Sequence, residues 1–136
     1  MIIVLSTYPD KEKAEAVALT IVENELAACV NIIKIENSIY RWKGEIKNNP
    51  EYLLLIKTTK KAYSQLEMLL KESHPYETPE IVSLEIKHTE KNYAKWVDSV
   101  VLSRLLRVPL DLSATRRASV PSNELTKAKK PSTLSR

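Results

Sequence analysis

The chain has 136 residues, of which 43% are apolar and 28% are charged, a composition typical of one soluble globular domain. Its single cysteine excludes an internal disulfide and favours a reducing, cytoplasmic compartment. The net charge of +4 is uneven, because residues 1–101 carry 13 Lys and Arg against 15 Asp and Glu, whereas residues 102–136 carry 8 against 2. A nucleic-acid-binding core is therefore not expected. No basic leader precedes the apolar start, and no apolar run approaches the roughly 20 residues of a membrane span, so we expect neither a signal peptide nor a membrane partner.

The first third of the chain predicts a strand, a helix and a second strand. Ile2–Ser6 is a short apolar run typical of a buried strand. Apolar residues then repeat at helical spacing over Lys11–Leu26, and Asp10 can cap this helix. A second strand is expected over Ala27–Ile35 and can continue to Tyr40.

The middle of the chain predicts a hairpin and a second helix. Gly44 is the only glycine, and it indicates a tight hairpin turn because glycine accepts a positive φ. The return strand is expected to be interrupted near Asn48–Pro50 and to be strongest over Tyr52–Thr58. An amphipathic helix is expected over Lys60–Ser73.

The segment from His74 to Glu80 joins this helix to the next strand and concentrates polar groups. Pro75 and Pro79 push the residue before each of them toward extended geometry, so the helix must end at about Ser73. A rigid polar connection of this kind is a candidate functional loop. The alternative is that two prolines simply shorten the connection.

A strand over Ile81–Ile86 and a helix from Asn92 to about Leu106 complete the expected elements. The order βαββαβ followed by one further helix predicts an α+β protein, a ferredoxin-like sandwich over residues 1–108. Residues 109–136 are basic and rich in Ser and Pro, and we expect a flexible or appended tail. Two helices cannot cover both faces of a four-stranded sheet, so self-association is expected.

Cys29 and His74 are the candidate reactive or metal-binding groups. A thiol and an imidazole suit a catalytic Cys/His pair or part of a copper site. A buried cysteine acting as a small hydrophobe is the alternative. Lys57 ends the most apolar strand, where it either pairs with a carboxylate, which Glu77 or Glu80 could supply, or extends its ammonium out to water. A single glycine excludes glycine-rich nucleotide-binding loops.

Five motifs occur in order along the chain. They are Leu26–Asn31, Ser38–Gly44, Leu55–Thr58, His74–Ile81 and Tyr93–Trp96. In sequence and spacing they resemble the CutA family of divalent-cation tolerance proteins, and the resemblance runs from about Ile2 to Val101. It implies a ferredoxin-like protomer in a tight homotrimer, related in architecture to the PII signalling proteins.

The resemblance also implies a role in metal tolerance, with binding of Cu(II) or other divalent cations. When the ligand positions of the family are transferred to the matching motifs of this sequence, the candidate metal ligands are Cys29 and His74, with Glu77 nearby. Ser6 and Ser73 stand where some members have a further Cys and a further His. This departure implies weak rather than tight metal binding.

Two other functions stay open beside the metal-tolerance interpretation. The protein could act as a PII-like sensor whose clefts between subunits are lined by Lys57, Tyr76 and Trp42. It could also be an enzyme that uses Cys29 or His74. The favoured expectation is a non-enzymatic, cytoplasmic homotrimer.

Overall fold

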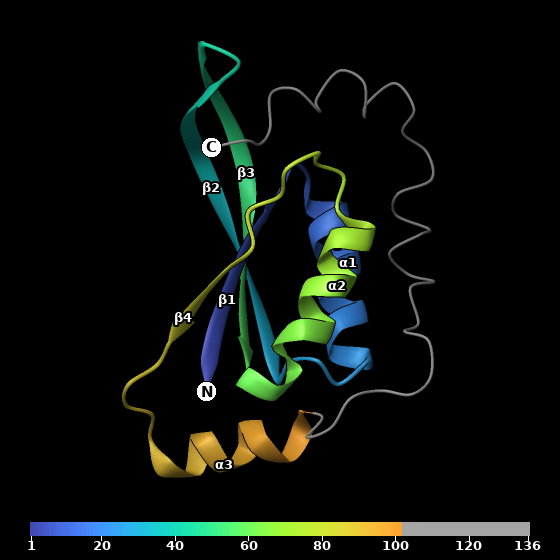
Figure 1. The fold of residues 1–136 in the computed structure, drawn as a ribbon, viewed down its shortest axis with the longest axis vertical. Helices are drawn as coiled ribbons and strands as arrows, with labels where there is room; N and C mark the ends of the chain where they lie inside the picture. Colours follow the sequence, from blue (N-terminus) through green and yellow to red (C-terminus); the bar gives the residue numbers. More distant parts are fainter. Residues whose placement is uncertain (102–136) are drawn as a thin grey trace.

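The computed structural model describes residues 1–101 and has the ferredoxin-like arrangement (Figure 1). In chain order the elements are β1 (Ile2–Tyr8), α1 (Lys11–Glu23), β2 (Cys29–Trp42), β3 (Glu45–Thr58), the 3₁₀ helix η1 (Lys60–Ala62), α2 (Tyr63–Ser73), β4 (Val82–Glu85) and α3 (Lys91–Val100). The strands form one antiparallel sheet in the order β2-β3-β1-β4. The predicted fold is thus confirmed. The helix expected to continue to about Leu106 was wrong, because α3 ends at Val100, where Val101 takes the extended angles φ −104° and ψ 140°. The boundary at residue 108 and the tail over 109–136 lie outside the described residues.

One face of the sheet packs against α1 and α2 and forms the main hydrophobic core (Figure 1). The two helices present apolar stripes at helical spacing, and the two central strands present every second side chain to them. The fully buried apolar residues of this core are Val4, Ala14, Val17, Ile21, Leu26, Leu54, Ile56, Leu66, Leu69 and Leu70. A smaller cluster, formed mainly by Ala62, Val97 and Val101, holds α3 at the end of the sheet.

The opposite face of the sheet is also apolar but carries neither α1 nor α2 (Figure 1). The strand registers place one set of apolar side chains on this face: Ile3, Leu5, Ile33, Leu53, Leu55, Val82 and Leu84. Ile33, Val82 and Leu84 are 45%, 46% and 51% exposed. We call this surface the open face. The expectation that two helices leave one sheet face uncovered is therefore confirmed for the described chain.

The β2–β3 hairpin is longer and more continuous than predicted. β2 reaches Tyr40, as expected, and runs on to Trp42. The expected interruption near Asn48–Pro50 was wrong, because β3 runs through it. A register shift between Ile35 and Ser38 on β2 lies opposite Pro50. A bulge tolerates a residue that cannot donate a backbone hydrogen bond, and β1 pairs with β3 only from Tyr52 onward.

The hairpin closes on Lys43 and Gly44, whose φ angles are 49° and 81°. Two consecutive positive φ values match the twist of a two-residue β-hairpin turn. The prediction for Gly44 is confirmed, while the left-handed Lys43 was not anticipated.

Element ends differ from the predicted ones for local reasons. α1 stops at Glu23 rather than at Leu26, because Glu25 takes a left-handed φ of 56° and cannot continue the helix. The helix expected from Lys60 begins as the single 3₁₀ turn η1, in which the Thr59 side chain accepts a hydrogen bond from the Ala62 amide. β4 is shorter than predicted and forms an exposed edge strand.

Replacing Leu69 with Ala should lower the free energy of unfolding by about 2–5 kcal/mol, because the side chain is fully buried and its truncation leaves a cavity. Chemical denaturation at one fixed protein concentration measures this loss. Leu19 on α1 is 54% exposed and is the matched control, for which the same truncation should change stability by less than about 0.5 kcal/mol. Equal losses at the two positions would contradict the packing of α2 against the sheet.

Candidate functional site

The loop from His74 to Glu80, which we call the proline crossing, begins where α2 ends. It packs on the end of β1. His74 has φ −74° and ψ 134°, the extended geometry predicted from the proline that follows it. Its imidazole stacks on Tyr8, with ring centroids 4.2 Å apart, and tilts against Tyr76 at 4.8 Å. The loop is therefore held against the sheet by three aromatic rings from two distant parts of the chain.

Both ring nitrogens of His74 are engaged inside the chain. The backbone amide of Tyr76 donates to Nδ1 at 3.2 Å, so the ring hydrogen belongs on Nε2, which lies 3.3 Å from Oγ of Ser6. Burial lowers the pKa of His74 from 6.5 to about 3, and a hydrogen bond with the backbone of Thr7 offsets only part of this shift. The imidazole is therefore neutral at physiological pH. It packs against Tyr8 and Tyr76, and both of its ring nitrogens are hydrogen-bonded.

Behind the loop lies a buried carboxylate that the sequence analysis missed. Glu51 is fully buried, and its Oε2 accepts a hydrogen bond of 3.0 Å from the Tyr76 hydroxyl. Its position follows from the sheet register, because Tyr52, the next residue on β3, pairs with Tyr8 at the end of β1. The only signal in the sequence was an acidic residue directly before an apolar strand.

Two hydroxyl groups near the loop, those of Ser73 and Tyr8, have structural roles. The Ser73 hydroxyl donates to the carbonyl of Leu69 at 2.7 Å, a bond that satisfies one of the last carbonyls of α2. Tyr8 is almost completely buried, and its hydroxyl has no partner within hydrogen-bonding geometry among the described residues. Burial raises the pKa of Tyr8, and the nearby Ser73 hydroxyl counters this only in part. The phenol is therefore protonated and does not serve as a base.

Comparison with known proteins identifies the family. The sequence model of the CutA1 divalent ion tolerance protein family matches residues 2–100. The chain belongs to the CutA1 family. The divalent-cation tolerance protein CutA of Thermus thermophilus is 46% identical over 95 residues, which cover 70% of this chain and 92% of that protein.

Solved CutA1 structures agree with the fold. CutA1 from Pyrococcus horikoshii superposes with a TM-score of 0.72 at 32% identity, over 75% of this chain and 99% of that one. A protein from Nostoc described as the PII-like protein CutA gives a TM-score of 0.67 at 35% identity, over 71% of this chain and 93% of its own. The resemblance inferred from the five motifs is thereby confirmed.

The three predicted metal ligands of this CutA1 protein do not meet within one chain. Cys29 begins β2 and pairs with Lys57, which in turn pairs with Ile3 on β1, whereas His74 lies beside Ser6. Glu77 is exposed on the crossing. Among residues 1–101, no group of three or more His, Cys, Asp or Glu side chains is arranged to hold a metal ion.

The three predicted cleft residues also lie apart in one protomer. The ammonium of Lys57 lies 5.9 Å from the ring centroid of Tyr93 on α3, and in the described chain it forms no ion pair. Its expected pairing with Glu77 or Glu80 was therefore wrong, because they lie on the crossing between α2 and β4, and α3 supplies an aromatic partner instead. Tyr76 is engaged with Glu51.

Trp42 lies at the far end of β2, next to the hairpin turn. The ammonium of Lys43 lies 5.4 Å from the centroid of its ring. A site that combined Trp42 with Lys57 and Tyr76 would therefore need more than one copy of the chain.

Replacing His74 with Gln should flatten the acid side of the stability profile. The pKa of His74 is lowered on folding, so the unfolded chain binds the extra proton, and stability falls as pH drops below 6.5 toward 3. This contributes a slope of up to about 1.4 kcal/mol per pH unit. Denaturation midpoints between about pH 7 and pH 5, above the usual carboxylate range, would measure it.

The control is His88→Gln, because His88 is exposed and is the only other histidine. This variant should keep the wild-type slope. An unchanged slope in His74→Gln would show that the imidazole is not held neutral by the fold.

Replacing Tyr76 with Phe should destabilise the protein by about 1–3 kcal/mol, because it removes a donor from a fully buried carboxylate. Tyr93→Phe removes a hydroxyl that has no hydrogen-bond partner in residues 1–101, and it should have little effect. Equal stability changes, measured by chemical denaturation, would exclude a special role for the bond between Tyr76 and Glu51.

Proposed function

We propose that this CutA1 protein acts as a homotrimer that binds divalent cations such as Cu(II), and that it functions by binding rather than by catalysis. The observation that carries the proposal is the open face, which exposes Ile33, Val82 and Leu84. Large contiguous apolar surfaces mark association sites. In the part of the chain that the structure describes, the edge strands β2 and β4 also have unpaired sides, which a neighbouring copy can satisfy.

Cys29 is the strongest of the candidate metal ligands. It is partly exposed, and its alternation with Val30 places it on the open face, where copies of the chain would meet. A thiolate is a soft ligand that suits copper. His74 would have to give up the Ser6 or Tyr76 contact before it could bind an ion. Glu77 is exposed and can add a harder oxygen ligand.

The second candidate function is a PII-like sensor that binds a small ligand between subunits. It is supported by the similarity to the Nostoc protein and by Lys57, whose ammonium faces an aromatic ring rather than a carboxylate. Such an ammonium is available for an anionic ligand. Assembly would be needed to bring Tyr76 and Trp42 into the same cleft.

We place the protein in the cytoplasm, because a single partly exposed thiol suits a reducing compartment. One related structure, from Archaeoglobus fulgidus, is described as periplasmic. Within residues 1–101, no helix has both the length and the apolar character needed to cross a bilayer.

Light scattering combined with calorimetric metal titration tests this function. The full chain should have three times the mass of one copy and should bind Cu(II) saturably. Cys29→Ser should weaken binding about tenfold or more while leaving the mass unchanged. Zn(II), which has no redox chemistry, separates coordination from oxidation of the thiol.

His74→Gln is the matched control in this titration. It should retain most of the binding, because both ring nitrogens are engaged within the fold. Equal loss in the two variants would contradict the assignment of Cys29 as the main ligand. A stable trimer that binds neither ion would exclude metal binding and leave the sensor function.

A further inference from the structure

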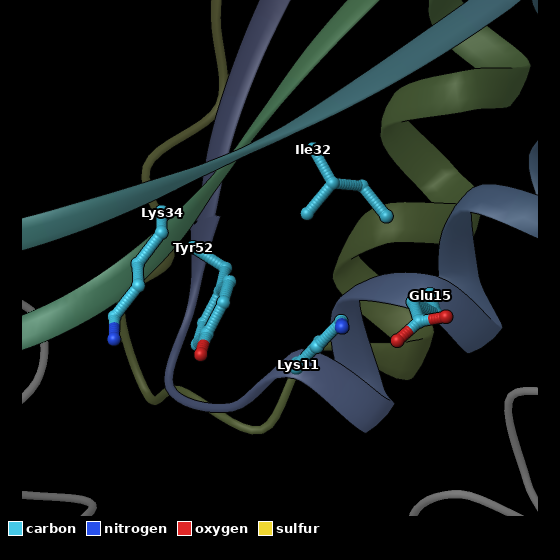
Figure 2. Close-up of a pocket in the computed structure, with 5 residues that line it drawn as sticks. All are labelled: Lys11, Glu15, Ile32, Lys34 and Tyr52. Carbon is cyan, nitrogen blue, oxygen red and sulfur yellow. The ribbon is translucent and has the colours of Figure 1, made fainter.

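A groove of about 510 Å³ lies between the start of α1 and the strands β2 and β3 (Figure 2). Its lining residues are Lys11, Glu15, Ile32, Lys34 and Tyr52. The size is in the range of small-molecule sites in proteins. None of these residues belongs to the candidate metal ligands or to the predicted cleft between subunits.

The groove exists because the sheet extends beyond the helix that covers it. Lys34 pairs directly with Tyr52, and Ile32 lies two residues earlier on the same strand, so all three share the helix-facing side of the sheet. Further along this side the strands carry core residues such as Leu54. The helix-facing side of the sheet becomes polar at Lys34 and Tyr52, which lie level with the start of α1.

Among the described residues, the polar side chains of the groove have no partners. Within residues 1–101, the side chains of Lys11, Glu15, Lys34 and Tyr52 form neither a hydrogen bond nor an ion pair. A lysine on the helix-facing side of a strand ordinarily gains a carboxylate or extends into water. Figure 2 shows Ile32, Tyr52, Lys11 and Glu15 around the hollow, with Ile32 as its apolar wall, while Lys34 lies on the other side of Tyr52 from Lys11.

The charges around the groove favour one kind of ligand. Two ammonium groups attract an anion, whereas the N-terminal end of α1 is already capped by the Asp10 carboxylate, which accepts from the Lys13 amide. The Tyr52 hydroxyl can donate a hydrogen bond to the same anion. Glu15 lies on the next turn of α1 and would repel a bare anion, but it can accept a hydrogen bond from an amino or hydroxyl group.

We propose that this groove binds a small organic anion that carries a phosphate or carboxylate at one end and an amino or hydroxyl group at the other. Lys34 and Tyr52 hold the anionic end, and Lys11 lies beside Glu15 at the other end. Ile32 contacts the carbon chain, and Glu15 accepts from the amino or hydroxyl group. This site is separate from the proposed metal binding and does not depend on it.

NMR titration of the full chain in about 150 mM NaCl tests the site, since at this ionic strength screening acts beyond about 8 Å. The probes are phosphoethanolamine, inorganic phosphate and ethanolamine. Phosphoethanolamine should shift the amide signals of the lining residues saturably and bind more tightly than phosphate, while ethanolamine should not bind. Lys34→Gln should weaken phosphoethanolamine binding about tenfold.

Two further variants separate this site from general charge attraction. Glu15→Gln should remove the preference for phosphoethanolamine over phosphate. Lys61→Gln changes an exposed lysine at η1, outside the groove, and should leave binding unchanged.

Three outcomes would overturn the proposal. The first is the absence of saturable shifts at millimolar probe concentration, which would also result if another copy of the chain covered the groove. The second is equal weakening by Lys34→Gln and Lys61→Gln, which would mean non-specific attraction of anions. The third is an unchanged preference for phosphoethanolamine in Glu15→Gln.

Discussion

Burial of one sheet face under two helices is the constraint on which the rest of this structure depends. β1 and β3 are the central strands, and their alternating side chains fill the core on one side only. The same alternation makes the other side mainly apolar, because the central strands present mostly Leu and Ile there, with Thr7 and Lys57 toward their ends. The open face, the exposed edge strand β4 and the expected association of copies all follow from this one packing arrangement.

The proline crossing is positioned by the end of β1 rather than by its own sequence. Tyr8 is the last residue of that strand, and it supplies the ring on which His74 stacks. Tyr76 then reaches the buried carboxylate of Glu51 on the neighbouring strand. Neutral histidine, protonated tyrosine and a hydrogen-bonded carboxylate together form a polar cluster that fixes the loop.

Three regions of the protomer therefore have different chemistry. The polar cluster around His74 is satisfied internally and stabilises the loop. Cys29 and Lys57 lie opposite each other on the open face, where further copies of the chain can complete a site. The groove beside Lys11 and Lys34 lies on the helix side of the sheet, against β2 and β3. Membership of the CutA1 family accounts for the shared fold, whereas ligand binding depends on which of these regions an assembled protein exposes.

The sequence by itself determined the elements, since local periodicity and a few special residues specify them. The helical stripe of α1, the extended geometry before Pro75 and the turn at Gly44 were all predictable from neighbours in the chain. Tertiary structure decided the contacts of His74 with Ser6, 68 residues away, and of Tyr76 with Glu51, 25 residues away. Such contacts depend on strand register and on where each element ends, and a shift of one residue moves every side chain to the other face. For the same reason the sequence could name Cys29, His74 and Lys57 as polar candidates but could not place them on different sides of one sheet.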